Sequence, residues 1–396
     1  MTPGHVLLCG GAEPAQIFDC AHNHELLSGL GGVPVNLLAR ALASRGWQVT
    51  VVSTSPHVAE PWRHREAGIE VVLVPMRIRA RERARDLFKL ERRALTDEIR
   101  LRRPDIVHAH WTYEFALAAL ASGLPTLVTA HDAPVTILRH FRDPYRVARL
   151  AMALWVRARH PPLTAVSPYL AERWRREMGW RGDIAVIPNI TPFGPHEGVP
   201  VSTPGLRVAT VADSSPHKNV TTVLEAWPIV LRALPHAELH LVGPGLGPAD
   251  DMAMWADHHS LLRQVVWHGE MGRADVKALI GSATALLHPS LEESQGMVLL
   301  EAMALGVAVV GGEASGGVPW TMGDAGVLTD VRSAAAIAAT VVDLLGDPQR
   351  CRNLGDMGKS RTADVFSIEA VASAYEKQYS AVLRKKPGHH FRESSV

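Results

Sequence analysis

The sequence predicts an α/β protein made of two Rossmann-like halves, each with a parallel β-sheet flanked by helices. Short apolar runs alternate with segments of helical length, and this alternation occurs twice along the chain. A proline-rich segment separates the two series. Apolar runs of this kind are typical of strands that are buried on both faces of a parallel sheet.

The predicted strands of the first half lie at 5–9, 48–53, 70–74, 106–110, 126–130 and 163–166. Those of the second half lie at 207–211, 238–242, 265–268, 285–288 and 307–310. Between the two series, residues 188–204 include five prolines, which break both helices and strands. We therefore predict an interdomain linker there, an N-terminal domain at 1–195 and a C-terminal domain at 196–371.

Composition and charge favour a globular protein without a global preference for polyanions. The 396 residues are 47% hydrophobic and 20% charged, and the net charge is +1. The three cysteines show neither CxxC nor zinc spacing, so we expect no disulfide framework and no structural metal. The apolar stretch at 147–156 is too short to span a bilayer, and no export signal is evident, so the prediction is a cytoplasmic protein.

The strongest motif follows the predicted strand 285–288 and places two acids around a glycine. Gly296 marks the start of a helix, Glu293 precedes it and Glu301 lies inside it. The free N–H groups of a helix start attract phosphate, and Gly296 allows close approach. We assign the diphosphate to this helix start with Met297 and Val298, ribose to Glu301 and sugar hydroxyls to Glu293; two solvated acids on an amphipathic helix are the alternative.

This stretch resembles the E-x7-E motif of the retaining glycosyltransferases of family 4, which have the GT-B fold. The resemblance extends over most of the chain. It implies two Rossmann-like domains that face each other across a cleft, the first for the acceptor and the second for the nucleotide-sugar donor. It also implies that the terminal helix, assigned to 372–390, crosses back to the N-terminal domain.

Further motifs carry the resemblance and its implied roles. Gly31 and Gly32 resemble the glycine pair under the donor phosphates, and His110 resembles the histidine that contacts the sugar O6. Lys218 resembles the lysine that binds the diphosphate. The remaining implied donor-binding positions are His131, in the next strand-end motif, Asn189, in the hinge signature, and Met271, near the base.

Two positions depart from the family pattern. Asp213 stands where the family usually has an arginine, so one expected positive charge is missing, for which Arg207 or His217 could compensate. Trp320 stands where glutamate is frequent. These departures leave open a nucleotide-sugar-binding protein that has lost catalysis, and a GT-B sugar-nucleotide epimerase is a further alternative.

The sequence contains neither an Asp-x-Asp pair nor a dinucleotide fingerprint. We therefore expect no metal requirement and no cofactor other than the nucleotide-sugar substrate, with a UDP-, GDP- or ADP-linked donor. The segment 243–247 has glycines, but Pro244 interrupts the G-x-G-x-x-G spacing. The acceptor would be a small molecule, a glycan or a lipid-linked compound, and the protein a monomer or homodimer.

A basic segment at 77–103 holds eleven Lys or Arg against five acids and is predicted as a long helix. A solvated helix face is one interpretation. The alternative is a patch for anionic lipid or an acidic acceptor, which would place the protein at the inner membrane face. Aromatic residues are too sparse there for nucleic-acid stacking.

Overall fold

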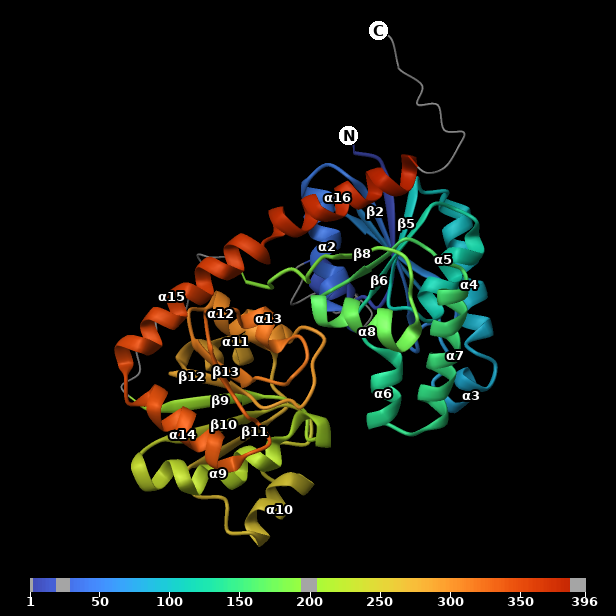
Figure 1. Ribbon diagram of the computed structural model, residues 1–396. Coiled ribbons are helices and arrows are strands. Elements are labelled where there is room, and N and C mark those ends of the chain that lie inside the picture. The colour runs from blue at the N-terminus through green and yellow to red at the C-terminus, as the bar shows by residue number, and fades with distance from the viewer. Residues whose placement is uncertain (1–2, 19–28, 194–204, 385–396) are drawn as a thin grey trace. The chain divides into compact units, whose positions relative to one another are not determined.

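A computed structural model describes residues 3–18, 29–193 and 205–384. The chain forms two compact units (Figure 1). Unit 1 takes residues 1–166, 170–190 and 368–396, and unit 2 takes residues 167–169 and 191–367. The two domains that we expected from the sequence end at 195 and 371. Part of the linker expected at 188–204 lies outside the described residues.

Unit 1 contains an eight-stranded sheet in the order β3-β4-β2-β1-β5-β6-β7-β8. Its strands are β1 (His5–Cys9), β2 (Gln48–Ser55), β3 (Trp62–Glu66), β4 (Ile69–Pro75), β5 (Ile106–His110), β6 (Thr126–Ala130), β7 (Leu163–Ala165) and β8 (Ile184–Val186). All neighbouring strands are parallel except β3 and β4. Strands β5 and β6 are buried at every residue, because helices cover both faces of the sheet.

Two apolar cores hold these helices against the sheet. One core joins α2 and α16 to the sheet, and the other joins α4, α5, α7 and α8 to its opposite face. The helices of this unit are α1 (Pro14–Ile17), α2 (Val33–Ser44), α3 (Ala80–Arg85), α4 (Lys89–Arg102), α5 (Glu114–Ser122), α6 (Pro134–His140), α7 (Pro144–Ala158), α8 (Pro168–Met178) and α16 (Ile368–Arg384).

Unit 2 contains a six-stranded sheet in the order β11-β10-β9-β12-β13-β14, and all of its strands are parallel. The strands are β9 (Arg207–Val211), β10 (Glu238–Val242), β11 (Val265–Gly269), β12 (Ala285–His288), β13 (Ala308–Gly312) and β14 (Val327–Thr329). Helices α9 and α14 share one apolar core with the sheet, and α11 and α12 share another on its opposite face. Two α/β units with helices on both faces confirm the predicted fold class.

The helical segments of unit 2 connect these strands. They are the 3-10 turn η1 (Pro216–Lys218), α9 (Val220–Ala233), α10 (Asp251–His258), α11 (Arg273–Ser282), α12 (Met297–Ala304), α13 (Val318–Met322), α14 (Ala334–Leu345) and α15 (Pro348–Val365). Helix α12 begins directly after Gly296, which has the left-handed φ of 85° at the N-cap. Gly296 therefore marks the loop-to-helix transition, as the sequence predicts.

The terminal helix α16 returns to unit 1, where polar contacts fix it as well as apolar packing. The hydroxyl of Tyr379 lies 2.9 Å from Nδ1 of His108, a buried residue of β5. Glu376 accepts hydrogen bonds from Arg45 and from Nε1 of Trp47, both from the first part of the chain. The last helix is thus a structural part of the first unit, which confirms the predicted crossing back.

Two expectations about unit 1 are wrong. The sheet is not entirely parallel, because β3 (Trp62–Glu66) runs antiparallel at its edge. The basic segment is not one long helix, because Leu87 and Phe88 take left-handed φ values of 53° and 60° and separate α3 from α4. Phe88 is buried in the core, so the break turns an aromatic side chain inward.

Each sheet reverses its strand order at one place. In unit 1, the chain builds outward in opposite directions from β1 and β5, which are neighbours. In unit 2, the same reversal occurs between β9 and β12. Loops at the carboxyl ends of such strand pairs lead to opposite faces of the sheet, and the crevice between them is where open α/β sheets bind ligands.

Candidate functional site

At the β1 and β5 reversal, four glycines let two loops of unit 1 approach closely. Gly10 and Gly11 follow β1, and Gly31 and Gly32 precede α2. Gly32 has a φ of 95°, and a Cβ there would collide with the carbonyl oxygen of Gly11. A Cβ on Gly10 would lie 3.0 Å from Cβ of His110. Bare backbone from both loops therefore lines the carboxyl end of β5.

His110 ends β5 and forms the centre of a buried pair with His131, which follows β6. Nδ1 of His110 lies 2.9 Å from Nε2 of His131, so one ring donates to the other. Nε2 of His110 is buried and has no hydrogen-bond partner among the described residues. A buried nitrogen without a partner is a candidate contact for a ligand hydroxyl.

Burial keeps these imidazoles neutral near pH 7. It lowers the pKa of His131 to about 3 and that of His110 well below its usual range, where the neighbouring histidines add to the effect. A neutral imidazole can donate or accept a hydrogen bond but carries no charge. The pair is therefore suited to binding hydroxyl groups and not to proton transfer.

Trp111 covers this pair from a strained backbone position. Its φ of 63° is unusual for a large side chain, and its ring centroid lies 4.6 Å from that of His131. Just beyond His131, the carboxylate of Asp132 accepts a hydrogen bond from the hydroxyl of Tyr113 at 2.7 Å and lies 3.8 Å from Nη2 of Arg149. The strained residue and the buried polar cluster together hold the strand-end loops.

In unit 2, an ion pair joins the loop after β9 to the loop after β12. Nζ of Lys218 donates to Oε1 of Glu293, and Nε2 of His288 lies 3.4 Å from the same oxygen. Burial alone would raise the pKa of Glu293, but His288 and Lys218 together hold it well below its usual range. Glu293 is thus an ionised carboxylate that holds Lys218 at the β9 and β12 reversal.

The side chain of Asn219 joins the loop after β9 to the loops after β12 and β14. Its Nδ2 donates to the carbonyl oxygens of Pro289 and Val331, at 3.2 and 2.7 Å. Its left-handed φ of 59° ends η1 and begins α9 immediately after Lys218. Lys218 therefore does not open α9 itself but lies in the short turn before it.

The start of α12 presents backbone donors beside this ion pair. The N–H groups of Met297 and Val298 have no acceptor in the part of the chain that the structure describes. Val298 packs with Met271 against one apolar core, so the residue expected near the base lies in the same region. Glu301 lies one turn deeper in the helix, and burial raises its pKa to about 7, with Arg273 opposing the shift.

Glycines also hold the loop after β13 against Glu293. The N–H of Gly317 donates to the carbonyl oxygen of Glu293 at 2.8 Å. A Cβ on Gly316 or Gly317 would collide with the backbone of Glu293 or Ser294. Trp320, at the position where glutamate is frequent, packs against Phe366 with ring centroids 5.7 Å apart. Its ring therefore contributes to packing.

The expected charge compensation by Arg207 does not occur at this site. Arg207 begins β9 and donates to Ser282 at 2.7 Å, whereas the site lies at the opposite end of that strand. Asp213 accepts hydrogen bonds from the backbone and side chain of Ser215, which shapes the loop before η1. His217, the other proposed compensating residue, lies in η1 beside Lys218, with Nδ1 3.0 Å from the Ser215 hydroxyl.

The candidate residues fall into two groups, one in each unit. Gly31, Gly32, His110, His131 and Asn189 belong to unit 1. Among these, Asn189 is buried and follows β8. Because β8 is the edge strand of the sheet, three places from β5, Asn189 does not follow either strand of the β1 and β5 reversal. The group in unit 2 comprises Lys218, Met271, Glu293, Gly296, Met297, Val298 and Glu301.

Sequence reasoning missed His288 and the pair Gly10 and Gly11. All three end or follow a buried apolar strand at a reversal point. The signal that could have found them is a polar residue or a glycine at the end of an apolar run, and the same signal identified His110.

No group of three His, Cys, Asp or Glu in the described ranges could hold a metal ion. None of the described helices is long and apolar enough to cross a membrane.

Two family models match the chain, one on each unit. The model described as Glycosyltransferase Family 4 matches residues 32–191, and that described as Glycosyl transferases group 1 matches residues 201–361. The chain belongs to glycosyltransferase family 4. It is therefore a glycosyltransferase with the GT-B fold, as the motif resemblance implied.

Two bacterial proteins are similar to this glycosyltransferase over most of its length. The N-acetyl-alpha-D-glucosaminyl L-malate synthase of Bacillus anthracis is 26% identical over 299 residues, which cover 71% of this chain and 75% of the relative. The glycogen synthase of Mycobacterium tuberculosis (strain ATCC 25618 / H37Rv) is 26% identical over 394 residues, with 91% and 92% covered.

Solved structures share the fold over nearly the whole chain. The sucrose-phosphate synthase from Thermosynechococcus elongatus has a TM-score of 0.76 at 19% identity, over 97% of this chain and 100% of that one. WaaG, a glycosyltransferase involved in lipopolysaccharide biosynthesis, has a TM-score of 0.69 at 15% identity, over 96% and 99% of the two chains.

The raised pKa of Glu301 predicts a pH-dependent stability. The folded state binds a proton at Glu301 more tightly than the unfolded chain does. The contribution of this proton to the free energy of unfolding is therefore complete below about pH 4.5 and is lost as the pH rises through about 7. The glutamine of Glu301→Gln does not titrate. As the pH rises from about 5 to about 8, the free energy of unfolding of this variant should therefore increase by about 1 to 3 kcal/mol relative to that of the unmodified protein.

Thermal unfolding of both proteins at the two pH values measures this gain, at roughly 2 to 4 °C per kcal/mol for a unit of this size. The exposed Glu225 of α9 provides the control, Glu225→Gln. A difference between Glu301→Gln and the unmodified protein that stays constant with pH would show that Glu301 is not protonated in the folded state.

Proposed function

We propose that this glycosyltransferase moves a hexosyl unit from a nucleoside-diphosphate sugar to an acceptor hydroxyl, with retention of anomeric configuration and without a metal ion. The observation that carries the proposal is the arrangement at the β9 and β12 reversal of unit 2. There, Lys218 pairs with Glu293, the free N–H groups of Met297 and Val298 begin α12, and the half-buried Glu301 lies one helical turn further along the same helix.

Each of these groups suits one part of the donor. The ammonium of Lys218 and the α12 N-terminus attract the diphosphate. The carboxyl group of Glu301 forms no hydrogen bond with any described residue, so its oxygens are free to accept hydrogen bonds from the hydroxyls of a ribose. Met271 and Val298 offer an apolar surface for the base. The crystal structure of Anabaena HepE in complex with UDP-glucose, from a protein with a TM-score of 0.64, supports a nucleotide-sugar donor.

Donor binding must loosen the ion pair between Lys218 and Glu293. The diphosphate carries about two negative charges, whereas Glu293 balances the charge of Lys218 in the structure. When the diphosphate attracts Lys218, Glu293 is left to accept hydroxyl groups of the transferred sugar. We propose the same kind of contact for Nε2 of the neutral His110, which binds a sugar hydroxyl in the reacting complex.

The proposed reaction has one bond broken and one formed at the same face of the sugar. The bond between the anomeric carbon and the diphosphate oxygen breaks, and the acceptor oxygen bonds to that carbon. The acceptor proton passes to the departing diphosphate oxygen, so no nucleophile from the protein is needed. Lys218 and the α12 N–H groups stabilise the charge that develops on the leaving diphosphate.

A panel of UDP-, GDP- and ADP-sugars with EDTA present tests this function. We expect one donor to be consumed, by slow hydrolysis or by transfer to an added acceptor, with the product in the donor's anomeric configuration as read by proton NMR. Turnover that stops in EDTA and returns with a divalent ion would contradict metal independence. An inverted product would contradict retention, and binding without turnover of any donor would favour the catalytically lapsed alternative.

Lys218→Ala should reduce turnover by on the order of a hundredfold or more, because it removes the cation beside the leaving diphosphate. Lys218→Arg keeps the charge and should retain a larger part of the rate. The exposed Lys377 of α16 provides the control, since Lys377→Ala removes a positive charge from unit 1. Rates of Lys218→Ala equal to those of the control would exclude Lys218 from the site.

A further inference from the structure

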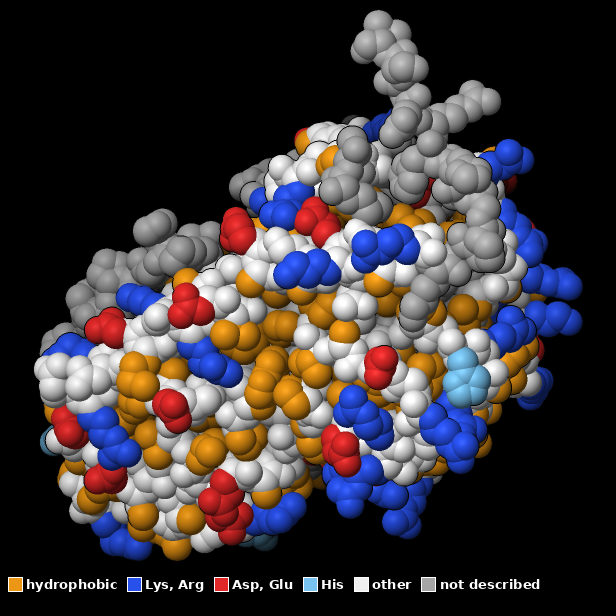
Figure 2. Space-filling model, turned by 45° about the horizontal axis from the view of Figure 1, so that its top comes forward, with side chains coloured by type: hydrophobic (Ala, Val, Ile, Leu, Met, Phe, Trp, Pro, Cys, Tyr) orange, Lys and Arg blue, Asp and Glu red, His pale blue; other side chains and the backbone are white. Residues whose placement is uncertain are grey.

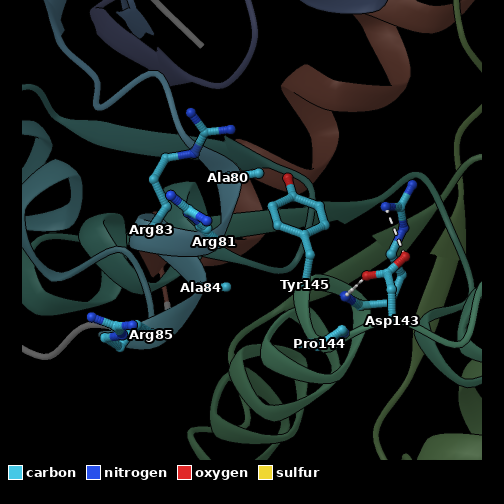
Figure 3. A pocket seen from close by; sticks show the side chains of 9 residues that line it. Ala80, Arg81, Arg83, Ala84, Arg85, Asp143, Pro144 and Tyr145 are labelled. Atoms are coloured by element: carbon cyan, nitrogen blue, oxygen red, sulfur yellow. Dashed lines mark hydrogen bonds and ion pairs between the residues drawn. The ribbon is translucent and has the colours of Figure 1, made fainter.

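Four of the nine residues that line a pocket of about 710 Å³ in unit 1 are arginines (Figure 3). The residues that give it its character are Arg81, Arg83, Arg85, Asp143, Tyr145 and Arg146. They come from two elements that are distant in sequence, α3 and the start of α7. Four arginines thus face a single carboxylate, that of Asp143, around one cavity.

The pocket lies on the same edge of the unit 1 sheet as His110. Helix α3 follows the carboxyl end of β4, and α7 follows α6, which begins just after the carboxyl end of β6. Because the strands concerned are parallel, these ends meet at one edge of the sheet. His110 ends β5 at that edge, between the two strands in the order of the sheet. The pocket therefore belongs to the ligand-facing side of unit 1.

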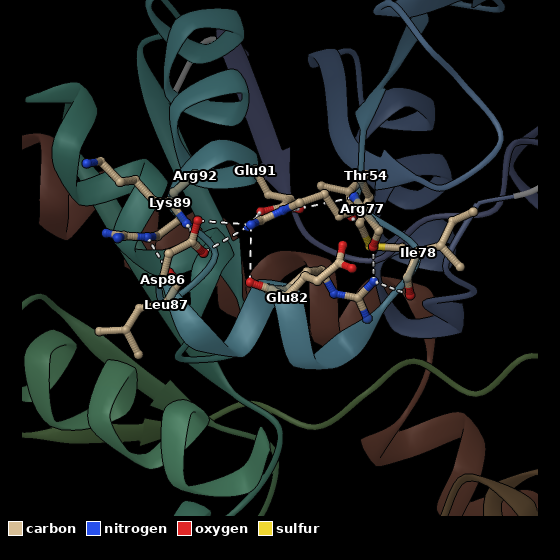
Figure 4. A network of polar contacts seen from close by, with 11 residues as sticks. Thr54, Arg77, Ile78, Glu82, Asp86, Leu87, Lys89, Glu91 and Arg92 are labelled. Atoms are coloured by element: carbon tan, nitrogen blue, oxygen red, sulfur yellow. Dashed lines mark hydrogen bonds and ion pairs between the residues drawn. The ribbon is translucent and has the colours of Figure 1, made fainter. Parts of the chain in front are cut away.

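A separate network fixes the wall that carries three of these arginines (Figure 4). Arg77 donates to Glu91 at 2.6 Å and to Asp86 at 2.8 Å, and Glu91 is only 1% exposed. Two carboxylates therefore neutralise Arg77 and tie the residue before α3 to the residues around the start of α4. This network holds α3 in place without using Arg81 or Arg85, whereas Arg83 adds hydrogen bonds to the backbone of Arg77 and Ile78.

The charges that line the pocket are largely uncompensated. Neither Arg81 nor Arg85 forms a hydrogen bond or ion pair with any described residue, and both are exposed. Arg83 donates to the backbone carbonyl oxygens of Arg77 and Ile78, and its Nε is buried with no partner among the described residues. Arg146 pairs with Asp143 at 3.1 Å and is the one pocket arginine with a carboxylate partner.

Such an arrangement favours the binding of an anion. Like charges held around one cavity repel each other, and the repulsion is relieved when a negatively charged group enters. Arginine presents planar pairs of N–H donors that match phosphate oxygens. Three arginines without a carboxylate partner offer more N–H donors than a ligand with one carboxylate group could accept, which favours a phosphate. Lysine and arginine side chains also gather along the right-hand edge of the face drawn in Figure 2, on the side of unit 1.

We propose that this pocket binds a phosphate group of the acceptor. This proposal rests on the proposed transfer function, in which unit 1 binds the acceptor, and it states the chemical class of that acceptor. A phosphate monoester and the headgroup of a phospholipid present the same chemistry to Arg81, Arg83 and Arg85. Ile78 and Val147, which are adjacent to the pocket in sequence and 77% and 54% exposed, offer apolar contact to the second source.

Direct binding to the full chain tests the pocket without any need for turnover. The probes are glycerol 3-phosphate, followed by calorimetry, and vesicles of equal parts phosphatidylcholine and phosphatidylglycerol, followed by sedimentation against vesicles of phosphatidylcholine alone. In Arg81→Gln/Arg85→Gln both side chains are exposed, so folding should be unaffected. Binding of at least one probe should weaken about tenfold or more in this variant, because two charge-assisted contacts are lost.

The matched control is Arg175→Gln/Arg181→Gln, which removes two exposed arginines from unit 1 outside the pocket. Loss of glycerol 3-phosphate binding in the pocket variant alone identifies a soluble phosphate acceptor. Loss of vesicle binding alone identifies a lipid headgroup. Equal loss in both variants, or no binding of either probe to the unmodified protein, would overturn the proposal.

Binding of nucleoside diphosphates, measured in the same variants, separates this proposal from the proposed donor site. The pocket variant should bind nucleoside diphosphates as the unmodified protein does, because the donor residues belong to unit 2. If the unmodified protein binds nucleoside diphosphates but neither phosphate probe, only the proposal for the pocket is contradicted. Failure of nucleotide binding in the unmodified protein instead contradicts the donor site.

Discussion

The reversal of strand order between neighbouring parallel strands is the constraint on which the candidate residues of each unit depend. Between β9 and β12, the chain leaves the sheet toward opposite faces, and the carboxyl ends of strands at such a reversal are where open α/β sheets form their ligand-binding crevice. Lys218 follows β9 in the chain, and Glu293 and Gly296 follow β12. The same constraint in unit 1 collects the glycine loops and His110 after β1 and β5.

Unit 2 offers less free positive charge to a diphosphate than the sequence predicted. The missing arginine at position 213 removes one positive charge, and the Lys218–Glu293 ion pair neutralises another before any ligand binds. Backbone dipoles then contribute a larger share, because the N–H groups of Met297 and Val298 point into the site without a competing acceptor. In unit 1 the pocket has the opposite character, because Arg81 and Arg85 have no carboxylate partner among the described residues.

Much of the fold was predictable because buried parallel strands are continuous apolar runs. The bounds of β1, β5, β6, β9, β10 and β12 match the predicted ranges. Strand β3, with the sequence Trp-Arg-His-Arg-Glu, was missed because an edge strand needs no apolar run. The break between α3 and α4 was missed because Leu87 and Phe88 are residues that rarely adopt left-handed φ, and tertiary packing of Phe88 imposes it.

The site was predictable only where a motif fixed its residues. The motif from Glu293 to Glu301 located the helix start, but no pattern predicted that Glu293 would pair with Lys218, 75 positions earlier in the chain. Such a contact depends on which strands are neighbours. Arg207 illustrates the same limit, since its distance from the site follows from its place at the beginning of β9. The arginine pocket likewise needs α3 and α7 to pack together.

Titration calorimetry of UDP, GDP and ADP tests the assignment of the β9 and β12 crevice most directly. The measurement compares the unmodified protein with Glu301→Gln at about pH 8, above the pKa of Glu301. One nucleotide should bind, and the variant should weaken it about tenfold, because a neutral amide with one acceptor oxygen replaces a charged carboxylate with two at the ribose hydroxyls; inorganic pyrophosphate should bind both proteins equally. Nucleotide affinity that is unchanged by Glu301→Gln, or pyrophosphate affinity that falls in parallel, would contradict this account of the site.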